Sequence, residues 1–519
     1  MDNKKLLYLV LALCVPLLVV GATALSESPV LTETPNTTIS APPEVYTPQF
    51  FEAHRQYMAS INFTWLGNES LNETLEKGNV GGGDVNVFKA ALEQDGFIVQ
   101  QGTLKTIPIF DLVNERVLFS CNGNNPSAPY KAYILPPAPN QSVPNPFADK
   151  TNMSIAYRLR PDEALVLIGK TPPNCTYFSY QSFQFYHFYP IEEAFRKIFA
   201  NVGDTLNHLT INPEGTSERE PFGCATIIVT SADRGTDQRV RAAAVSAGYS
   251  PAIMNTEVLP SSIFRMGIEM ECDPFVFLHR IAFFTDAQAG NAYMNSNPGV
   301  VFRITPKAQA ERDPYKVQEL RVRGTGNTSE FELMGALNDL RQALLERFGA
   351  DNATELVTSV WLTEGYDAIQ RGVDVLGVTR DTTYLNTTPF TLADDPNEFL
   401  IVYGVNHVAT GKAIYSSFGV YGTTLANGVA AVDNQQFAST AEEYIPGHPA
   451  ANYLYVWKVA RQCNGDPHCL KVPSTPGAYG VGLDEQAFVA FRAYVDPPTK
   501  VGPAYSEIVY DRVIKFGIP

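Results

Sequence analysis

The chain of 519 residues is 45% hydrophobic and 11% aromatic, and its 54 acidic and 38 basic residues give a net charge of −16. This much apolar material excludes disorder for most of the sequence, and the length predicts one very large domain or two to three ordinary ones. The acidic balance excludes a general role in binding nucleic acid or an anionic membrane surface, because phosphates require a basic face.

The N-terminus has the three parts of a secretory signal peptide. Lys4 and Lys5 precede an apolar run over residues 6–20, and small residues follow up to Ala24. The run suits a signal peptide better than a bilayer span of about 20 residues, and Pro16 interrupts it. We predict that residues 1–24 are a signal peptide cleaved after Ala24, which leaves no membrane span; an uncleaved anchor is the alternative. Residues 25–48, rich in Ser, Thr and Pro, are predicted to form a flexible stem.

Acceptor sites for N-glycosylation are frequent after this segment. Chance pairing of asparagine with serine and threonine would give roughly three or four such sites. The sequence has ten, and they begin at Asn36, Asn62, Asn68, Asn72, Asn140, Asn152, Asn174, Asn327, Asn352 and Asn386. Together with the signal peptide they predict a secreted or cell-surface glycoprotein.

The cysteine content agrees with an oxidising compartment, because six cysteines follow the signal peptide and an even number permits complete pairing. Cys463 and Cys469 flank a turn-rich spacer, so we predict a local disulfide between them. His468 raises a metal site as the alternative, but no second pair has metal-ligand spacing, and we predict no metal. The four others admit three pairings, and the sequence does not choose among them: Cys121, Cys175, Cys224 and Cys272.

The first half of the globular part alternates between helix and strand signals. Helices are predicted over residues 50–61, over 84–96 with Asp84 as N-cap, over 191–209, and over 237–247 up to Gly248. Strands are predicted over residues 97–101, 106–110, 164–168 and 225–230. The aromatic segment 177–189 is read as a strand with one buried face, and stacking on a ligand is its alternative role.

A long helix and a series of strands are predicted further on. The helix covers residues 330–348, with Ser329 and Glu332 as a capping box and an apolar stripe that includes Leu337 and Leu340. Strands are predicted over residues 399–403, 413–421, 452–459, 487–495 and 507–516. The fold class is therefore α+β, with a mixed α/β lobe over residues 49–356 and a mostly antiparallel β lobe over 357–519 packed on it.

One candidate site lies where the strand 225–230 meets the next helix. In an open α/β sheet, ligands bind at such a junction because backbone N–H groups and the helix dipole gather there. Asp233 would then act as a catalytic group, and Arg234 and Thr236 would bind ligand. The alternative is that Asp233 or Thr236 only caps the helix.

A second candidate centres on His407, at the end of an apolar strand and beside a turn that includes Lys412. An imidazole there would serve as a general base, with Lys412 as a ligand-binding group, or it would be held structurally in a hairpin. Arg380 and Asp381 precede another strand and are read as an ion pair at the junction of the lobes.

The motifs that would name a reaction are absent from the sequence. Gly169-Lys170-Thr171 lacks the first glycine and the helix of a phosphate-binding loop, and no zinc-peptidase, nucleophile-elbow or calcium-loop pattern occurs. No cofactor is predicted. We expect an exported protein that binds a small molecule, a glycan or a surface protein; the alternative is an extracytoplasmic hydrolase that uses Asp233 and His407.

Overall fold

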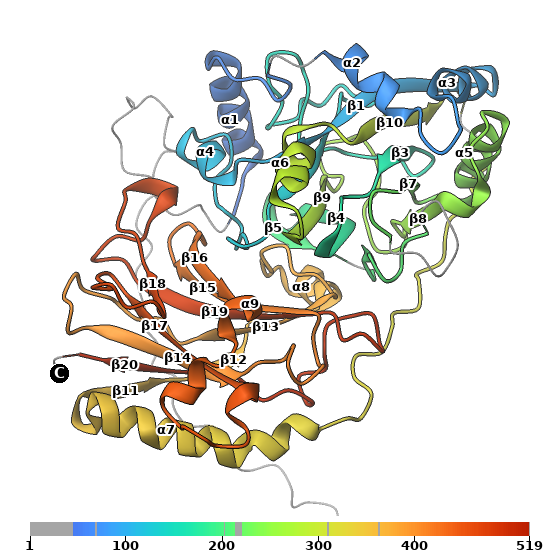
Figure 1. Cartoon of the computed structure of the whole chain (residues 1–519). Helices are drawn as coiled ribbons and strands as arrows, with labels where there is room; N and C mark the ends of the chain where they lie inside the picture. The colour runs from blue at the N-terminus through green and yellow to red at the C-terminus, as the bar shows by residue number, and fades with distance from the viewer. Residues whose placement is uncertain are drawn as a thin grey trace, which may run out of the picture.

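Two lobes follow one another along the chain in the computed structural model, which describes residues 45–67, 70–201, 203–212, 221–308, 311–361 and 364–517 (Figure 1). The predicted signal peptide, nearly all of the predicted stem, Asn36 and Asn68 lie outside these residues. The structure confirms the α+β fold class. No helix in the described part of the chain is long and apolar enough to cross a membrane.

The N-terminal lobe is built on one ten-stranded sheet with the order β5-β4-β9-β2-β1-β10-β3-β7-β8, and β6 pairs with β4. Only the pair β7–β8 is parallel. Its helices are α1 (Pro48–Ser60), α2 (Leu71–Leu75), α3 (Val85–Gln94), α4 (Ile109–Asn114), α5 (Arg234–Ser246) and α6 (Ala287–Asn295). Its strands are β1 (Phe97–Thr106), β2 (Tyr130–Ile134), β3 (Ala164–Lys170), β4 (Cys175–Tyr189), β5 (Ala194–Ala200), β6 (Leu206–Asn207), β7 (Ala225–Ser231), β8 (Met254–Val258), β9 (Phe275–Phe284) and β10 (Gly299–Pro306).

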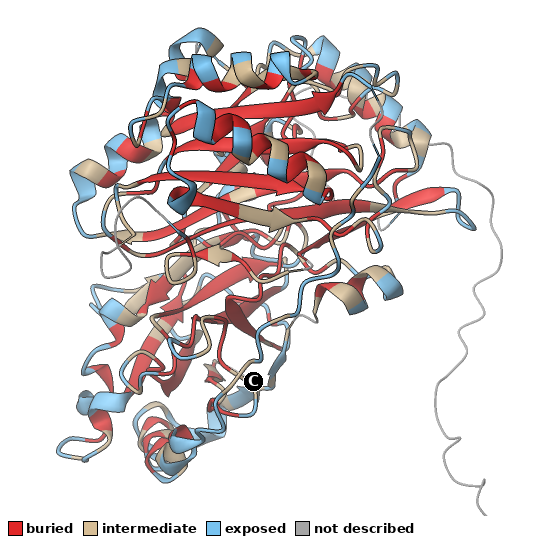
Figure 2. Ribbon diagram, turned by 90° about the vertical axis from the view of Figure 1, so that its right-hand side faces the viewer, coloured by how far each residue is buried: buried red, intermediate tan, exposed pale blue. Residues whose placement is uncertain are grey.

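Helices α3 and α5 cover the outer face of this sheet, and side chains on both of its faces are buried (Figure 2). The apolar side of α3, including Phe88 and Leu92, packs with Val240 of α5 against alternate residues of β3, β7 and β10. Asp84 caps α3 as predicted, since its carboxylate accepts from the backbone N–H groups of Asn86 and Val87. The cap and the apolar stripe together position this layer.

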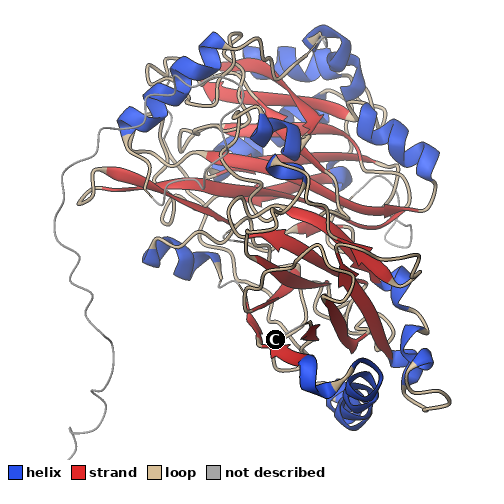
Figure 3. Ribbon diagram, turned by 90° about the vertical axis from the view of Figure 1, so that its left-hand side faces the viewer, coloured by secondary structure: helices blue, strands red, loops and turns tan. Residues whose placement is uncertain are grey.

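The C-terminal lobe is a sandwich of two five-stranded sheets, with the orders β11-β20-β14-β17-β18 and β12-β13-β19-β15-β16 (Figure 3). Its helices are α7 (Met334–Phe348), α8 (Gly365–Arg371) and α9 (Asn434–Phe437), and the 3-10 turn η3 (Ser329–Leu333) leads into α7. Its strands are β11 (Ala353–Leu356), β12 (Thr358–Val360), β13 (Thr382–Thr387), β14 (Phe399–Val405), β15 (Tyr415–Gly422), β16 (Gly428–Asp433), β17 (Leu454–Ala460), β18 (Cys469–Lys471), β19 (Ala487–Tyr494) and β20 (Arg512–Phe516).

Successive side chains along the strands of the sandwich point alternately into its core and away from it. Val489 and Phe491 of β19 join the core between the sheets, whereas Phe488, Ala490 and Arg492 point away from it. The apolar side of α7, with Leu337 and Leu340, covers the outer face of the first sheet. The outer face of the second sheet therefore remains to meet the N-terminal lobe.

The boundary between the lobes lies earlier than predicted. β11 pairs with β20 and α7 packs on β14 and β17, so residues from Ser329 onward belong to the C-terminal lobe, not those from 357 onward. The predicted capping box also does not form, because neither η3 nor α7 has a side-chain cap at its N-terminus.

Four other predictions of local structure are wrong. Within the predicted helix 191–209, residues 194–200 form β5 and residues 206–207 form β6, because β5 pairs with β4 and is buried along almost its whole length. Residues 106–110 end β1 and begin α4 rather than forming a second strand. The strands on either side of His407 do not form a hairpin, since β14 and β15 belong to different sheets. The aromatic strand β4 is buried on both faces along most of its length, not on one.

Candidate ligand site between the lobes

Asp233 acts as the N-cap of α5, in agreement with the alternative reading of this residue. Its carboxylate accepts hydrogen bonds from the backbone N–H of Thr236 at 2.7 Å and of Asp313 at 2.6 Å. Helix α5 begins at Arg234 rather than at the predicted residue 237. Both carboxylate oxygens are therefore occupied by the backbone, which fixes the start of the helix and the loop that reaches Asp313.

The two predicted ligand-binding neighbours of Asp233 have local partners. Arg234 forms a two-pronged ion pair with Asp313, at 2.7 Å for each hydrogen bond, and more than half of its side chain is exposed. The hydroxyl of Thr236 donates to the carbonyl of Asp162. The pair with Asp313 holds the loop 311–315 against α5, and neither Arg234 nor Thr236 lines the cavity described below.

His407 and Lys412 lie in a buried polar cluster of the C-terminal lobe. Nδ1 of His407 is 2.9 Å from Glu330, and Nε2 is 3.7 Å from Asp511. Burial acts to lower the pKa of His407, but the two carboxylates raise it to about 10. Lys412 pairs with Glu507 at 2.6 Å. At neutral pH His407 is therefore an imidazolium with a carboxylate on each side, which is the arrangement of an ion pair and not of a general base.

The structure does not bring Asp233 and His407 together. Asp233 follows β7 in the N-terminal lobe, and His407 follows β14 in the C-terminal lobe (Figure 1). Their hydrogen-bonding partners in the described residues have no member in common. The acid/base pair that a hydrolase would need is not assembled from these two residues.

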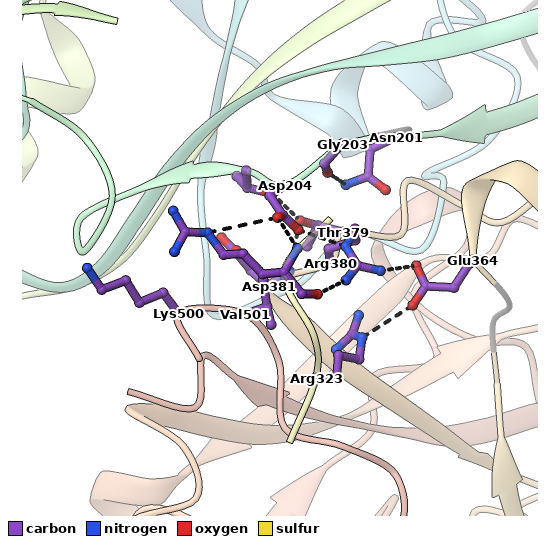
Figure 4. Close-up of polar contacts among 12 residues, drawn as sticks. Asn201, Gly203, Asp204, Arg323, Glu364, Thr379, Arg380, Asp381, Lys500 and Val501 are labelled. Carbon is purple, nitrogen blue, oxygen red and sulfur yellow. Dashed lines mark hydrogen bonds and ion pairs between the residues drawn. The ribbon is translucent and has the colours of Figure 1, made fainter. Parts of the chain in front are cut away.

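Arg380 lies at the junction of the lobes, as the sequence indicated, but its partners are not Asp381. Its guanidinium contacts Asp204 of the N-terminal lobe at 2.8 Å and Glu364 at 3.0 Å, and Arg323 contacts the same Glu364 at 3.2 Å (Figure 4). This chain of alternating charges crosses from one lobe to the other. It fixes the rim of the junction.

Asp381 is buried beside this network and has neutral partners. It accepts hydrogen bonds from the hydroxyl of Tyr177 at 2.9 Å and from the amide of Asn207 at 2.9 Å, both of which belong to the N-terminal lobe. Burial raises the pKa of Asp381 to about 7, against the lowering effect of these hydrogen bonds. Asp381 therefore carries only part of a negative charge at neutral pH.

A cavity lies between the lobes. The N-terminal lobe contributes apolar residues of β4, β5 and β9 and of the segment around α4, and the C-terminal lobe contributes β13, β19 and the loop before β13. Its walls are Ile107, Ile109, Leu118, Cys121, Asn122, Gly123, Asn124, Tyr130, Ile155, Phe185, Phe199, Val276, Leu278, Arg280, Trp361, Leu376, Gly377, Tyr384, Arg492 and Tyr494. No carboxylate or histidine is among them.

The cavity is small. The volume of the cavity, counted as the space that the centres of water molecules can occupy, is about 60 Å³. Since one water needs about 10–15 Å³ of such space, the cavity has room for a few waters or a small ligand. A second, wider depression beside α1 has a wall of mixed polar and apolar residues, and Asn62, one of the predicted glycosylation sites, is part of it.

Two arginines, one from each lobe, are the only cationic residues of the cavity wall. Arg280 of β9 donates to the carbonyl of Gly377, and Arg492 of β19 donates to the carbonyl of Gly123 at 2.7 Å and to the hydroxyl of Tyr421. Both are at least 94% buried. In the described part of the chain no carboxylate lies within ion-pair distance of either guanidinium. An arginine pair of this kind gives no signal in the sequence, because it depends on which strands meet.

The structure pairs two of the six cysteines that follow the predicted signal peptide. Cys463 and Cys469 form the predicted disulfide, with sulfurs 2.06 Å apart. The four other described cysteines are thiols in this structure. Cys121, on the cavity wall, has a pKa raised to about 12 by burial. No group of three or more potential metal ligands occurs in residues that the structure describes.

Comparison with known proteins gives no family. No protein-family model matches the chain, and no curated protein matches it.

Proposed function

We propose that this chain is an exported glycoprotein that binds a small ligand in the cavity between its lobes. The observation that carries the proposal is the cavity itself, whose apolar walls come from both lobes. Sites for small molecules are concave, mostly apolar and placed at such junctions, with a few polar groups that orient the ligand. A ligand in this position would contact both lobes and stabilise their contact.

Binding is a better account of the cavity than hydrolysis. A hydrolase needs a nucleophile or a titratable acid and base within reach of one substrate atom. The described walls hold no carboxylate and no imidazole, and the Cys121 thiol is protonated at neutral pH because of its raised pKa. Asp233 and His407 are both occupied elsewhere.

Export is supported by the position of the acceptor asparagines. Seven of the eight that the structure describes are exposed, and Asn386 is partly exposed on β13. The disulfide Cys463–Cys469 is compatible with an oxidising compartment.

The export part is tested on native protein from the producing cells. We expect a mature N-terminus after Ala24, a mobility shift on glycosidase treatment, and a peptide linked by Cys463–Cys469 in a non-reducing digest. Native protein that retains residues 1–24, carries no glycan and is found inside the cell would overturn this part.

The binding part is tested with benzene as an uncharged apolar probe. We expect saturating benzene to raise the melting temperature of the full mature chain, and Val276→Phe, which fills the cavity from β9, to abolish the rise. Ile281→Phe is the matched control, because Ile281 lies on the opposite face of the same strand, in another core. If the rise is absent in the unaltered protein, or survives Val276→Phe, the cavity is not the site.

A further inference from the structure

The two guanidiniums of the cavity point to the charge of its ligand. A buried cation is costly unless an anion or hydrogen-bond acceptors replace its water. Nε of Arg280 is buried with no hydrogen-bonding partner in the described residues. The aromatic rings that pack on the two guanidiniums, among them Phe183 at 5.0 Å and Tyr421 at 5.2 Å, supply weak compensation only. An anion between them would complete the pairing.

Three tyrosines add hydrogen-bond donors to the same wall. The hydroxyls of Tyr130 and Tyr494 each accept a hydrogen bond from Asn125, and that of Tyr384 accepts one from the backbone N–H of Thr379. No contact in the described chain gives the protons of these three hydroxyls an acceptor. Each hydroxyl therefore retains a donor for a ligand oxygen.

The two arginines of the wall lie close to the same tyrosines. Tyr130, Tyr384 and Tyr494 interact electrostatically with both arginines, so the two guanidiniums share one set of neighbours. The backbone carbonyls nearest to them, those of Gly123 and Gly377, already accept from the arginines. The wall thus offers unused donors beside occupied acceptors, which fits an anion and disfavours a cation.

The protein's own acids do not cancel this charge. Asp381 interacts electrostatically with Arg280 but lies beyond ion-pair distance and is held by Tyr177 and Asn207. Asp374, near the cavity, pairs with Lys197 at 2.7 Å. Two full positive charges therefore face at most part of one negative charge.

From these contacts we infer that the cavity binds a small organic monoanion, a carboxylate on a short apolar body, with its carboxylate between Arg280 and Arg492. The planar guanidinium matches a carboxylate in geometry. Most of the remaining wall is apolar, which suits an aliphatic body and not the three strongly hydrated oxygens of a phosphate. The volume limits the body to a few carbons. The inference rests on the proposed ligand-binding function and adds the ligand class to it.

The test compares butanoate with its uncharged relative butanamide on the full mature chain, by calorimetric titration at one salt concentration. Hydrogen bonds to a charged group make a difference of roughly tenfold or more, so we expect butanoate to bind at least about tenfold more tightly than butanamide. Butylammonium is expected to show no binding. This comparison needs no variant and stays decisive where a variant fails to fold.

Variants assign the effect to the two arginines. Arg280→Gln and Arg492→Gln each remove one charge from the wall, and each is expected to weaken butanoate binding at least about tenfold while leaving benzene binding within twofold. Arg347→Gln, which removes an exposed charge on α7 that pairs with Glu443, is the matched control and leaves butanoate binding unchanged.

The outcomes separate the two proposals. Benzene binding without a preference for butanoate over butanamide overturns the carboxylate inference and leaves the proposed function intact. Equal stabilisation by chloride overturns it as well, in favour of a halide site. If neither benzene nor butanoate binds, both proposals fail.

Discussion

Replacing His407 by glutamine tests the buried ion pair of the C-terminal lobe. The imidazolium lies 2.9 Å from Glu330 and 3.7 Å from Asp511, and all three side chains are almost fully buried. His407→Gln removes the only cation between two carboxylates. Removing one partner of a buried pair costs about 3–5 kcal/mol, because the other charge stays buried without compensation.

The pH dependence of stability gives a second measure of the same interaction. The pKa of His407 is raised from 6.5 to about 10, so its contribution to stability is fully present below pH 6.5 and is lost as the pH rises through 10. A pKa difference of this size corresponds to an upper limit of roughly 5 kcal/mol. The unaltered protein should therefore lose stability between pH 6.5 and 10, and the variant should lose much less.

Urea unfolding followed by tryptophan fluorescence measures both effects. Trp457 lies in the same lobe, on β17, and reports on its sheet. His448→Gln is the matched control, because His448 is 30% exposed and 3.7 Å from the exposed Asp339, so its loss should cost less than about 1 kcal/mol. If His407→Gln unfolds at the same urea concentration as the unaltered protein and with the same pH profile, the reasoning on this cluster is wrong.

Further predictions concern the lobe junction, the disulfide and the first turn of α5. Because burial raises the pKa of Asp381 to about 7, its contribution to stability is greatest below pH 3.8 and is lost as the pH rises through 7; Asp381→Asn should flatten the stability profile there by roughly 2–4 kcal/mol in urea titrations. Replacing Cys463 and Cys469 by serine should cost about 2 kcal/mol, since the closed loop is short, and adding reductant to the unaltered protein should cost the same. Asp233→Ala should cost about 1–2 kcal/mol in thermal unfolding, and Arg234→Ala should cost less than Asp233→Ala; a larger loss for Arg234 would contradict the capping role.

Local signals in the sequence were sufficient for helices with a cap and one apolar side. Asp84 and Gly96 bracket α3, and the leucines of α7 mark the side that packs on the first sheet. The same local signals were misleading for β5, where Phe195 and Ile198 have the spacing of a helix. The strand is buried on nearly every side, so the alternation that identifies a strand is missing, and pairing with β4 decides its structure.

The candidate site lay beyond what the sequence could indicate. Arg280 and Arg492 are ordinary arginines in apolar strands, and nothing near them in sequence marks a ligand. Their relation follows from the outer face of β19 meeting β9 across the junction, which is a tertiary event. Asp233 and His407 had recognisable local contexts, and those contexts proved to be a helix cap and an ion pair.

Both sheets of the sandwich take up one of the two latest strands in their interior: β19 lies between β13 and β15, and β20 between β11 and β14. During synthesis or passage through a translocation channel, each sheet lacks one of its interior strands until residues 487–516 emerge. The N-terminal lobe has all of its strands once residue 306 has emerged. A nascent chain halted before β19 would expose two incomplete sheets and carry one arginine of the pair, so the wall of the cavity is completed only when residues 487–516 have joined the sandwich.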